Sequence, residues 1–180
     1  MTVDSFDLIL CDIHAPMIHA WRKAFVAHSE VEIVHGSIID IAADAYVSPA
    51  NGFGMMDGGI DIVLRDRFPL VESRVQDAIA ARGEHLPVGH CVIVATGDFD
   101  VPYLLCAPTM LFPCQVAHTN HAFLAMQAIL MEVTRFNSAG SKIAGVAVPG
   151  LCTGIGAMNP QDAAVQMAEA YRDWLALASD

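Results

Sequence analysis

The order of apolar runs along the chain constrains its fold more than any other feature of the sequence. Short apolar runs typical of strands lie at 6–11, 31–36, 44–50, 89–97, 101–109 and 142–150. Helices are predicted, from apolar residues that recur every three or four positions and from the placement of prolines, at 16–28, 60–67, 70–82, 120–136 and 160–177. This alternation predicts an α/β domain, a three-layer α/β/α sandwich with a mixed, mainly parallel sheet.

One domain is expected to occupy the whole chain, residues 1–180. Hydrophobic residues make up 54% of the sequence, and neither a linker nor a low-complexity tract interrupts it. A chain of this length buries about two-thirds of its surface on folding, so its core needs no disulfide or metal to hold it.

The cysteines and the N-terminal segment predict a cytoplasmic protein. The five cysteines are odd in number and form no Cys-x-x-Cys motif, and three of them lie in apolar runs, which indicates buried free thiols. The first 14 residues lack the basic segment of a secretory signal peptide, and no apolar stretch reaches the length of a membrane span.

The charge balance limits the class of partner. Nine Lys and Arg stand against 20 Asp and Glu, which gives a formal net charge of −11. Nonspecific nucleic-acid binding and attraction to anionic membranes both depend on basic side chains, so we expect neither partner. A small anionic ligand remains possible where backbone N–H groups, rather than side-chain cations, bind it.

Two glycine-rich loops are the candidate functional segments, each after a predicted strand and before a predicted helix. The first runs from Ser48 to Asp61 and the second from Pro149 to Pro160, and neither contains Lys or Arg. In parallel sheets, ligands bind beyond the carboxyl ends of the strands, and glycines let backbone N–H groups approach a phosphate. Tight turns are the alternative reading of each loop, but two such loops at one sheet edge favour a diphosphate site.

The loop sequences resemble the macrodomain family, whose members bind ADP-ribose and its derivatives. The family's Gly-Asp-Ile, Asn-Ala-Ala-Asn and glycine-run Val-Asp segments correspond to 36–38, 48–51 and 57–61. The family's Ser-Thr-Gly in the second loop is similar to 152–154. The resemblance covers nearly the whole chain and implies a macrodomain-like fold with an ADP-ribose cleft between the loops.

The resemblance also implies roles for single residues. Asn51 would hold the distal ribose, and Asp61 matches the acid that positions or activates water in the hydrolysing branch of the family. A carboxylate there stabilises an oxocarbenium-like transition state. Asp57 is a further candidate catalytic residue that the family pattern does not supply, either as an extra acid or base or as a charge that repels a second phosphate. The residues expected to contact the ligand are Ser37, Ile38, Ala50, Gly58, Gly59, Ile60, Pro149, Cys152, Thr153, Gly154, Ile155 and Gly156.

Several positions depart from the family pattern. Ser37 stands where the family usually has an Asp that accepts a hydrogen bond from the adenine amino group, and Asp57 replaces a glycine. The aromatic residue of the second loop is missing, and Phe53 and Phe112 are the candidates to cover the ribose instead. These departures indicate a divergent branch, whose natural ligand can differ from plain ADP-ribose.

Other readings of these residues stay open. Asp61 also suits a helix N-terminus, and Asn51 also suits a turn. Cys152 is expected to pack rather than to act as a nucleophile. Cys114, His118 and His121 have a spacing found at zinc sites, but a fourth ligand is not evident, so we expect no metal.

The leading expectation is an enzyme that removes ADP-ribose, or a related group, from a protein or small-molecule acceptor, with no cofactor. A non-catalytic module that binds ADP-ribose or a nucleotide metabolite is the first alternative. A phosphatase acting on ADP-ribose phosphate is another, although Asp57 would repel the added anion. An interaction protein that has kept the fold and lost the cleft is the last.

Overall fold

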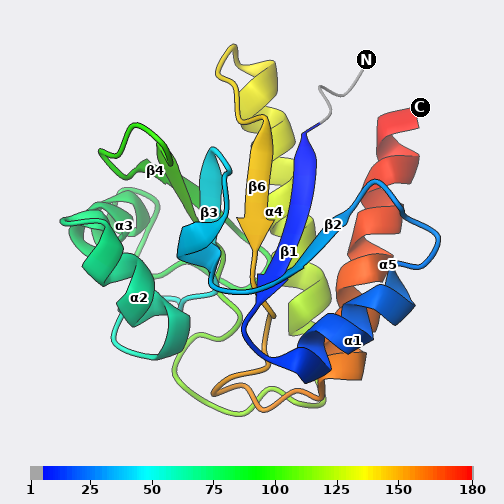
Figure 1. Ribbon diagram of the computed structural model, residues 1–180. Coiled ribbons are helices and arrows are strands. Elements are labelled where there is room, and N and C mark those ends of the chain that lie inside the picture. Colours follow the sequence, from blue (N-terminus) through cyan, green and yellow to red (C-terminus); the bar gives the residue numbers. More distant parts are fainter. Residues whose placement is uncertain (1–5, 180) are drawn as a thin grey trace.

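The computed structural model describes residues 6–179, in which a six-stranded sheet lies between two layers of helices (Figure 1). Residues 1–5 of the predicted N-terminal segment and residue 180 lie outside the described part. The strands are β1 (Asp7–Asp12), β2 (Glu32–His35), β3 (Ala45–Ser48), β4 (Val92–Ala95), β5 (Tyr103–Cys106) and β6 (Gly145–Val148). The α-helices are α1 (Ala15–Ala24), α2 (Gly59–Arg67), α3 (Val71–Ala80), α4 (His121–Ser138) and α5 (Pro160–Ser179), and a short 3-10 helix covers Ile38–Asp40.

The sheet has the order β2-β1-β6-β3-β5-β4. Neighbouring strands are parallel except for β4, which runs antiparallel to β5 with Val92 opposite Cys106. The prediction of a mixed, mainly parallel sheet is therefore confirmed. The carboxyl ends of the parallel strands share one edge, at the bottom of Figure 1, where the long loops gather.

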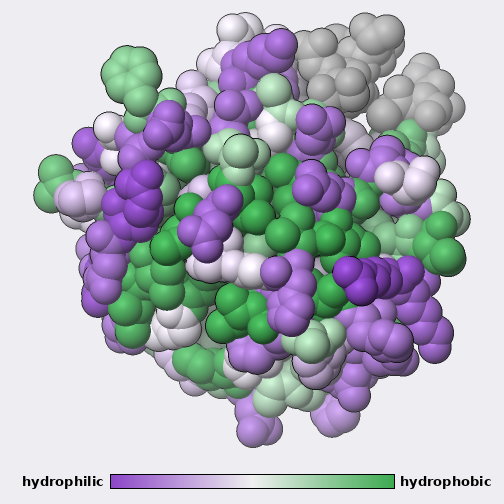
Figure 2. All heavy atoms as spheres, in the orientation of Figure 1, coloured by the Kyte–Doolittle hydropathy of each residue, from purple (hydrophilic) through white to green (hydrophobic). Residues whose placement is uncertain are grey.

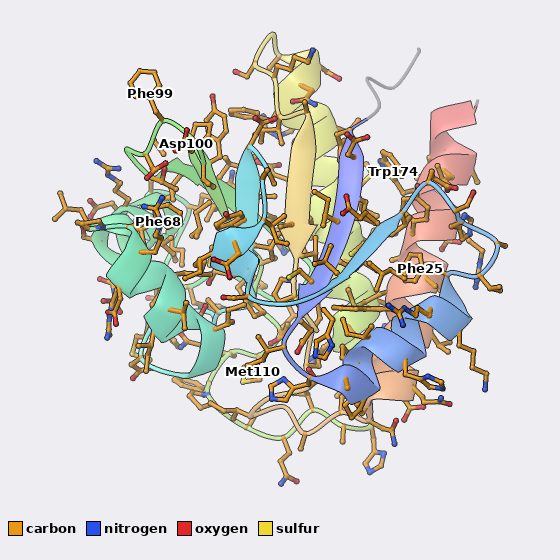
Figure 3. All side chains as sticks on the ribbon, viewed as in Figure 1. Phe25, Phe68, Phe99, Asp100, Met110 and Trp174 are labelled. Carbon is orange, nitrogen blue, oxygen red and sulfur yellow. The ribbon has the colours of Figure 1, made fainter. Side chains whose placement is uncertain are left out.

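Alternate residues of each strand face opposite helical layers, as the two-residue period of a strand requires. In β1, Leu8 and Leu10 join the core under α1, α4 and α5, while Ile9 joins the core under α2 and α3. Figure 3 labels Phe68 in the α2–α3 layer, and Phe25 and Trp174 on the opposite side. Helices therefore cover both faces, which is the expected three-layer arrangement.

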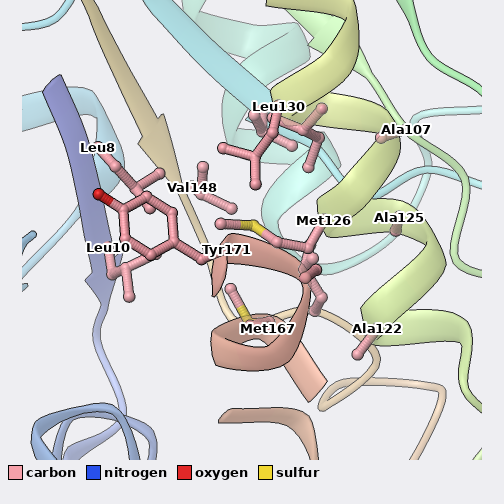
Figure 4. Packing of buried hydrophobic residues seen from close by; sticks show 14 of the residues in the cluster. Leu8, Leu10, Ala107, Ala122, Ala125, Met126, Leu130, Val148, Met167 and Tyr171 are labelled. Carbon is pink, nitrogen blue, oxygen red and sulfur yellow. The ribbon is translucent and has the colours of Figure 1, made fainter. Parts of the chain in front are cut away.

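The larger core lies where α4 and α5 pack on β1 and β6. Figure 4 shows Met126 and Met167 between these helices and the strands, and both are fully buried. Trp21 of α1 is also fully buried, and its Nε1 donates a hydrogen bond to Sδ of Met167 at 3.4 Å. The apolar face predicted for the helix at 120–136 is buried along its whole length.

Several helix ends differ from the sequence prediction, and two of these differences have a visible cause. The first helix stops at Ala24 rather than at 28, because the chain turns with the N–H of His28 bonded to the carbonyl of Phe25. The fourth helix continues to Ser138, where the buried side chain of Asn137 makes hydrogen bonds to both backbone groups of Ile143. Over residues 6–179, no helix has both the length and the apolar character needed to cross a membrane.

Candidate functional site

A cleft of about 680 Å³ opens at the edge of the sheet where the parallel strands end. The end of β1, the starts of α1 and α2 and the loops after β2, β3, β5 and β6 line it, and Met110 of the loop after β5 is labelled in Figure 3. Figure 2 shows hydrophobic surface across the middle of the face in view, between hydrophilic margins. Within the described residues, the cleft lining contains three aspartates and one histidine but neither Lys nor Arg.

The end of β3 and the start of α2 are joined by a side-chain hydrogen bond. Ser48, the last residue of β3, is fully buried, and its Oγ donates to Oδ1 of Asp61 at 2.6 Å. Asp61 lies in the first turn of α2, where the helix dipole favours a negative charge. The bond fixes the carboxylate at the wall of the cleft.

The surroundings of Asp61 make its carboxyl unusually basic. Burial raises the pKa of Asp61 to about 6, and the nearby carboxylates of Asp57 and Glu72 act in the same direction. The Ser48 hydrogen bond favours the ionised form and opposes this rise. A carboxyl group with such a pKa changes its charge close to neutral pH, which suits a general base.

Asn51 folds the first loop around its own side chain. It is 7% exposed, and its Oδ1 accepts hydrogen bonds from the N–H groups of Phe53 and Met55 at 3.0 and 3.3 Å. Its Nδ2 donates to the carbonyl of Met55 at 3.1 Å. An amide nitrogen carries two hydrogens, so one donor of this cleft-lining residue remains for a ligand.

The rest of the first loop is anchored on α3. The N–H of Met56 donates to Oε1 of Glu72 at 2.8 Å, and the side chain of Met56 is fully buried. Gly54 has a φ of +67°, and a Cβ there would lie 2.7 Å from Cγ1 of Val75. The loop therefore needs glycine at this position both for its backbone conformation and for its close approach to α3.

The second loop is held from the end of β1. The N–H of Gly150 donates to Oδ2 of Asp12 at 3.1 Å, and a Cβ on Gly150 would lie 2.7 Å from the same oxygen. Further along, the N–H of Ala157 bonds to the carbonyl of Gly154, and that of Met158 bonds to the carbonyl of Cys152. These turns curl the loop towards the start of α2.

Both loops present backbone N–H groups that are not used within the protein. Over the described residues, no protein acceptor is bonded to the N–H groups of 58–60 in the first loop or of 153–156 in the second. The loops face each other closely, since a Cβ on Gly58 would lie 3.6 Å from Cδ1 of Ile155. Such paired N–H groups are suited to hold phosphate oxygens without a side-chain cation.

The residues to which the sequence analysis gave catalytic or ligand-contacting roles all line this one cleft. They are Ser37, Ile38, Ala50, Asn51, Asp57, Gly58, Gly59, Ile60, Asp61, Pro149, Cys152, Thr153, Gly154, Ile155 and Gly156. The structure brings them together from three strand ends and the start of α2. Their individual roles toward a ligand stay predictions.

Two expectations about aromatic and thiol groups have a clear outcome. Phe53 and Phe112 do not line the cleft. Their tilted rings lie against each other with centroids 5.0 Å apart, and Phe53 also contacts His85. The apolar residue that projects over the first loop is Ile155. Cys152 is buried, and burial raises the pKa of its thiol to about 12, so a packing role suits it better than nucleophilic attack.

The possible zinc ligands do not form a site. Within residues 6–179, no three His, Cys, Asp or Glu side chains gather in a way that would hold a metal ion. Cys114 is exposed, and Nδ1 of His121 lies 2.8 Å from the carbonyl oxygen of Thr109.

The sequence did not indicate Asp12 and His14 as cleft residues, nor the hydrogen bond of Ser48 to Asp61. Asp12 directly follows the apolar run of β1. A polar residue at the carboxyl end of a predicted parallel strand is the signal that would have found it. The partnership of Ser48 with Asp61 has no such signal, because the two residues are 13 positions apart.

Comparison with known proteins identifies the family of this chain. The family model described as the macro domain matches residues 47–168. The chain belongs to the macrodomain family. An uncharacterized protein of Aquifex aeolicus (strain VF5) is 30% identical to this macrodomain over 143 residues, which cover 79% of this chain and 81% of that relative.

Solved macrodomain structures share the fold. The macrodomain of Mycobacterium tuberculosis DarG has a TM-score of 0.65 at 22% identity, covering 77% of this chain and 87% of that one. A mutant of the Oceanobacillus iheyensis macrodomain with ADPR has a TM-score of 0.64 at 16% identity, covering 77% and 74%. Thermosipho africanus DarTG in complex with ADP-ribose has a TM-score of 0.61 at 16% identity, covering 84% and 46%. These matches confirm the macrodomain-like α/β fold.

Proposed function

We propose that this macrodomain binds ADP-ribose, or a closely related ADP-ribosyl group, and hydrolyses the bond between the distal ribose and its acceptor. The solved Thermosipho africanus and Oceanobacillus iheyensis macrodomains with ADP-ribose support this ligand class. The opposed N–H groups of 58–60 and 153–156 support a diphosphate between the two loops. The cleft volume of about 680 Å³ also lies in the range of ligand-binding pockets.

The Ser48–Asp61 hydrogen bond carries the proposal of hydrolysis. Because Ser48 occupies Oδ1, Oδ2 of Asp61 is the oxygen free to accept a proton from water. The water oxygen then bonds to the anomeric carbon as the bond from that carbon to the acceptor breaks, and the proton taken by Asp61 passes to the departing acceptor. The carboxylate also stabilises the positive charge that develops on the ribose.

The test compares release of ADP-ribose from a mono-ADP-ribosylated protein by the wild type, Asp61→Ala and Asp66→Ala. Asp66 is the matched control, because it lies on the same helix with its side chain 68% exposed and outside the cleft. We expect release by the wild type and Asp66→Ala, and a loss of roughly a hundredfold or more in Asp61→Ala. Absence of release by the wild type, together with measurable ADP-ribose binding, would reject the hydrolase.

Binding without turnover is the second candidate. The hydrogen bonds of Asn51 favour it. Its side-chain amide makes three hydrogen bonds within its own loop, so it shapes the cleft for binding rather than for catalysis. Saturable binding of ADP-ribose that Asn51→Ala weakens, with no release of ADP-ribose from any acceptor, would establish this alternative.

A further inference from the structure

The end of β1 places a fixed pair of ionisable side chains in the cleft. Oδ1 of Asp12 accepts hydrogen bonds from the backbone N–H and from Nδ1 of His14, both at 2.8 Å. Oδ2 of Asp12 accepts from the N–H of Gly150. The side chain of Asp12 is 12% exposed and that of His14 is 75% exposed. Asp12 is therefore held on both oxygens, and His14 is held at one edge of its ring.

This pairing sets the hydrogen-bonding character of the free edge of His14. A carboxylate only accepts, so Nδ1 of His14 must carry the hydrogen of their bond. In the neutral ring Nε2 then has no hydrogen and is an acceptor. Within the described residues Nε2 of His14 has no protein partner, and the residue lines the cleft. The free edge is thus a hydrogen-bond acceptor available to a ligand.

The sheet order places this acceptor at the end of the cleft away from Asp61. Asp61 lies beside the end of β3, the second loop follows β6, and His14 follows β1, in the spatial order β1-β6-β3. Neighbouring strands are about 4.8 Å apart, so the two ends are separated by roughly 10 Å. A diphosphate between the loops with its reacting ribose at Asp61 therefore directs the other end of the ligand to His14.

The walls at this end of the cleft are largely apolar. Ile13, Pro16, Met17 and Ile38 line the cleft beside the Asp12–His14 pair. Ser37 also lines this end, but a hydroxyl both donates and accepts and so does not distinguish an amino group from other substituents. In the neutral ring held by Asp12, Nε2 of His14 accepts and does not donate, so it distinguishes them.

We propose that the Asp12–His14 pair determines nucleobase specificity, with Nε2 of His14 accepting a hydrogen bond from an exocyclic amino group on the base. Asp12 acts through His14 as a positioning residue, since both its oxygens are engaged within the protein. The proposal rests on the proposed binding of an ADP-ribosyl group. It assigns the base-reading acceptor to the end of β1, a segment outside the residues that the macro domain model matches.

The experiment measures the affinity of ADP-ribose and of its purine-riboside analogue, which has hydrogen in place of the 6-amino group, by titration calorimetry. The proteins are the wild type, His14→Ala and, as matched control, His19→Ala, an exposed histidine on α1 outside the cleft. One net hydrogen bond predicts that the wild type and His19→Ala bind ADP-ribose roughly three- to tenfold more tightly than the analogue. His14→Ala is expected to weaken ADP-ribose by that factor and to leave the analogue unchanged.

The other outcomes separate this proposal from the proposed function. If His14→Ala weakens both ligands equally, or neither, the base-reading role is wrong while ADP-ribose binding stands. If the wild type binds neither ligand, the proposed function itself fails and the base-reading role fails with it. Asp12→Asn is a second variant. The Asn amide can donate a hydrogen bond to Nδ1 of His14, which allows the tautomer that carries its hydrogen on Nε2. It should reduce the preference for ADP-ribose over the analogue.

Discussion

The hydroxyl of Ser48, buried at the end of β3, donates a 2.6 Å hydrogen bond to the carboxylate of Asp61 in the first turn of α2. This contact ties the proposed general base to β3, whose four residues are all buried. It also stabilises the ionised form of Asp61, because a hydroxyl that donates to a carboxylate lowers the pKa of that group. The proposed chemistry therefore depends on a residue that has no contact of its own with the reacting atoms.

Removal of this contact should shift the pH dependence of hydrolysis. The pKa of Asp61 is about 6 with the bond in place, so wild-type activity should rise with pH through that value. In Ser48→Ala the pKa should be higher still, and the rising limb should move to higher pH. Ser48→Thr keeps the hydroxyl and should restore the profile. Initial rates from pH 5 to 9 test this, and an unmoved limb in Ser48→Ala would contradict the role given to Ser48.

Replacement of Asp61 by Asn should stabilise the protein near neutral pH. The pKa of Asp61 is raised from 3.8 in the unfolded chain to about 6 in the folded protein. Between these values the unfolded chain loses a proton that the folded protein keeps, so wild-type stability falls as pH rises from about 4 to 6. Asp61→Asn removes this loss, which amounts to roughly 2–3 kcal/mol at pH 7.

Urea unfolding at pH 4 and pH 7 measures this effect. The gain in the free energy of unfolding should be present at pH 7 and should nearly vanish at pH 4. Asp66→Ala, at an exposed position of the same helix, should show no comparable difference between the two pH values. Equal effects of Asp61→Asn at both pH values would mean that burial does not raise the pKa of Asp61.

Replacement of Gly54 by Ala should destabilise the protein by more than the strain of a positive φ alone would. Its φ is +67°, and an added Cβ would lie 2.7 Å from Val75 and 2.9 Å from Ile79. Gly140 also has a positive φ of +96° but has open space around a Cβ. Gly140→Ala should therefore cost about 1 kcal/mol and Gly54→Ala about 2–4 kcal/mol. Similar unfolding free energies for the two variants would show that the first loop accommodates the added Cβ without a further loss of stability.

Affinity for ADP-ribose should depend only weakly on salt. The described lining of the cleft has no Lys or Arg, and its proposed phosphate contacts are backbone N–H groups. Binding falls steeply with ionic strength where salt screens contacts between side-chain cations and an anionic ligand. We expect the dissociation constant measured at 50 and 500 mM NaCl to change by less than about threefold. A steep rise with salt would reveal basic contacts that the cleft lacks.

Much of the fold followed from local patterns in the sequence. Three features could be predicted because each depends on residues close in the chain. They are the apolar strand that ends at Asp12, the proline between α2 and α3, and the apolar face of α4. The helix that ends at Ala24 was predicted too long. Phe25 continues the helical spacing and is buried, yet the chain turns there. Spacing alone does not separate the last helical residue from a buried residue just beyond it.

The candidate site was readable for the same local reason, but its side-chain contacts were not. Both glycine loops follow predicted strands, so the topology of a parallel sheet already placed them at one edge. The Ser48–Asp61 bond and the bond from Gly150 to Asp12 join residues 13 and 138 positions apart. Such contacts depend on how the elements pack, and single-sequence patterns do not contain that information.

The most direct test of the account is the rate at which Asp61→Asn releases ADP-ribose from a saturating mono-ADP-ribosylated protein, measured beside its affinity for free ADP-ribose. Asn keeps the shape and the hydrogen bond from Ser48 but cannot accept a proton from water. We expect release at least about a hundredfold slower than that of the wild type, with the affinity for ADP-ribose within about threefold. Release as fast as that of the wild type would contradict the role of Asp61 as general base.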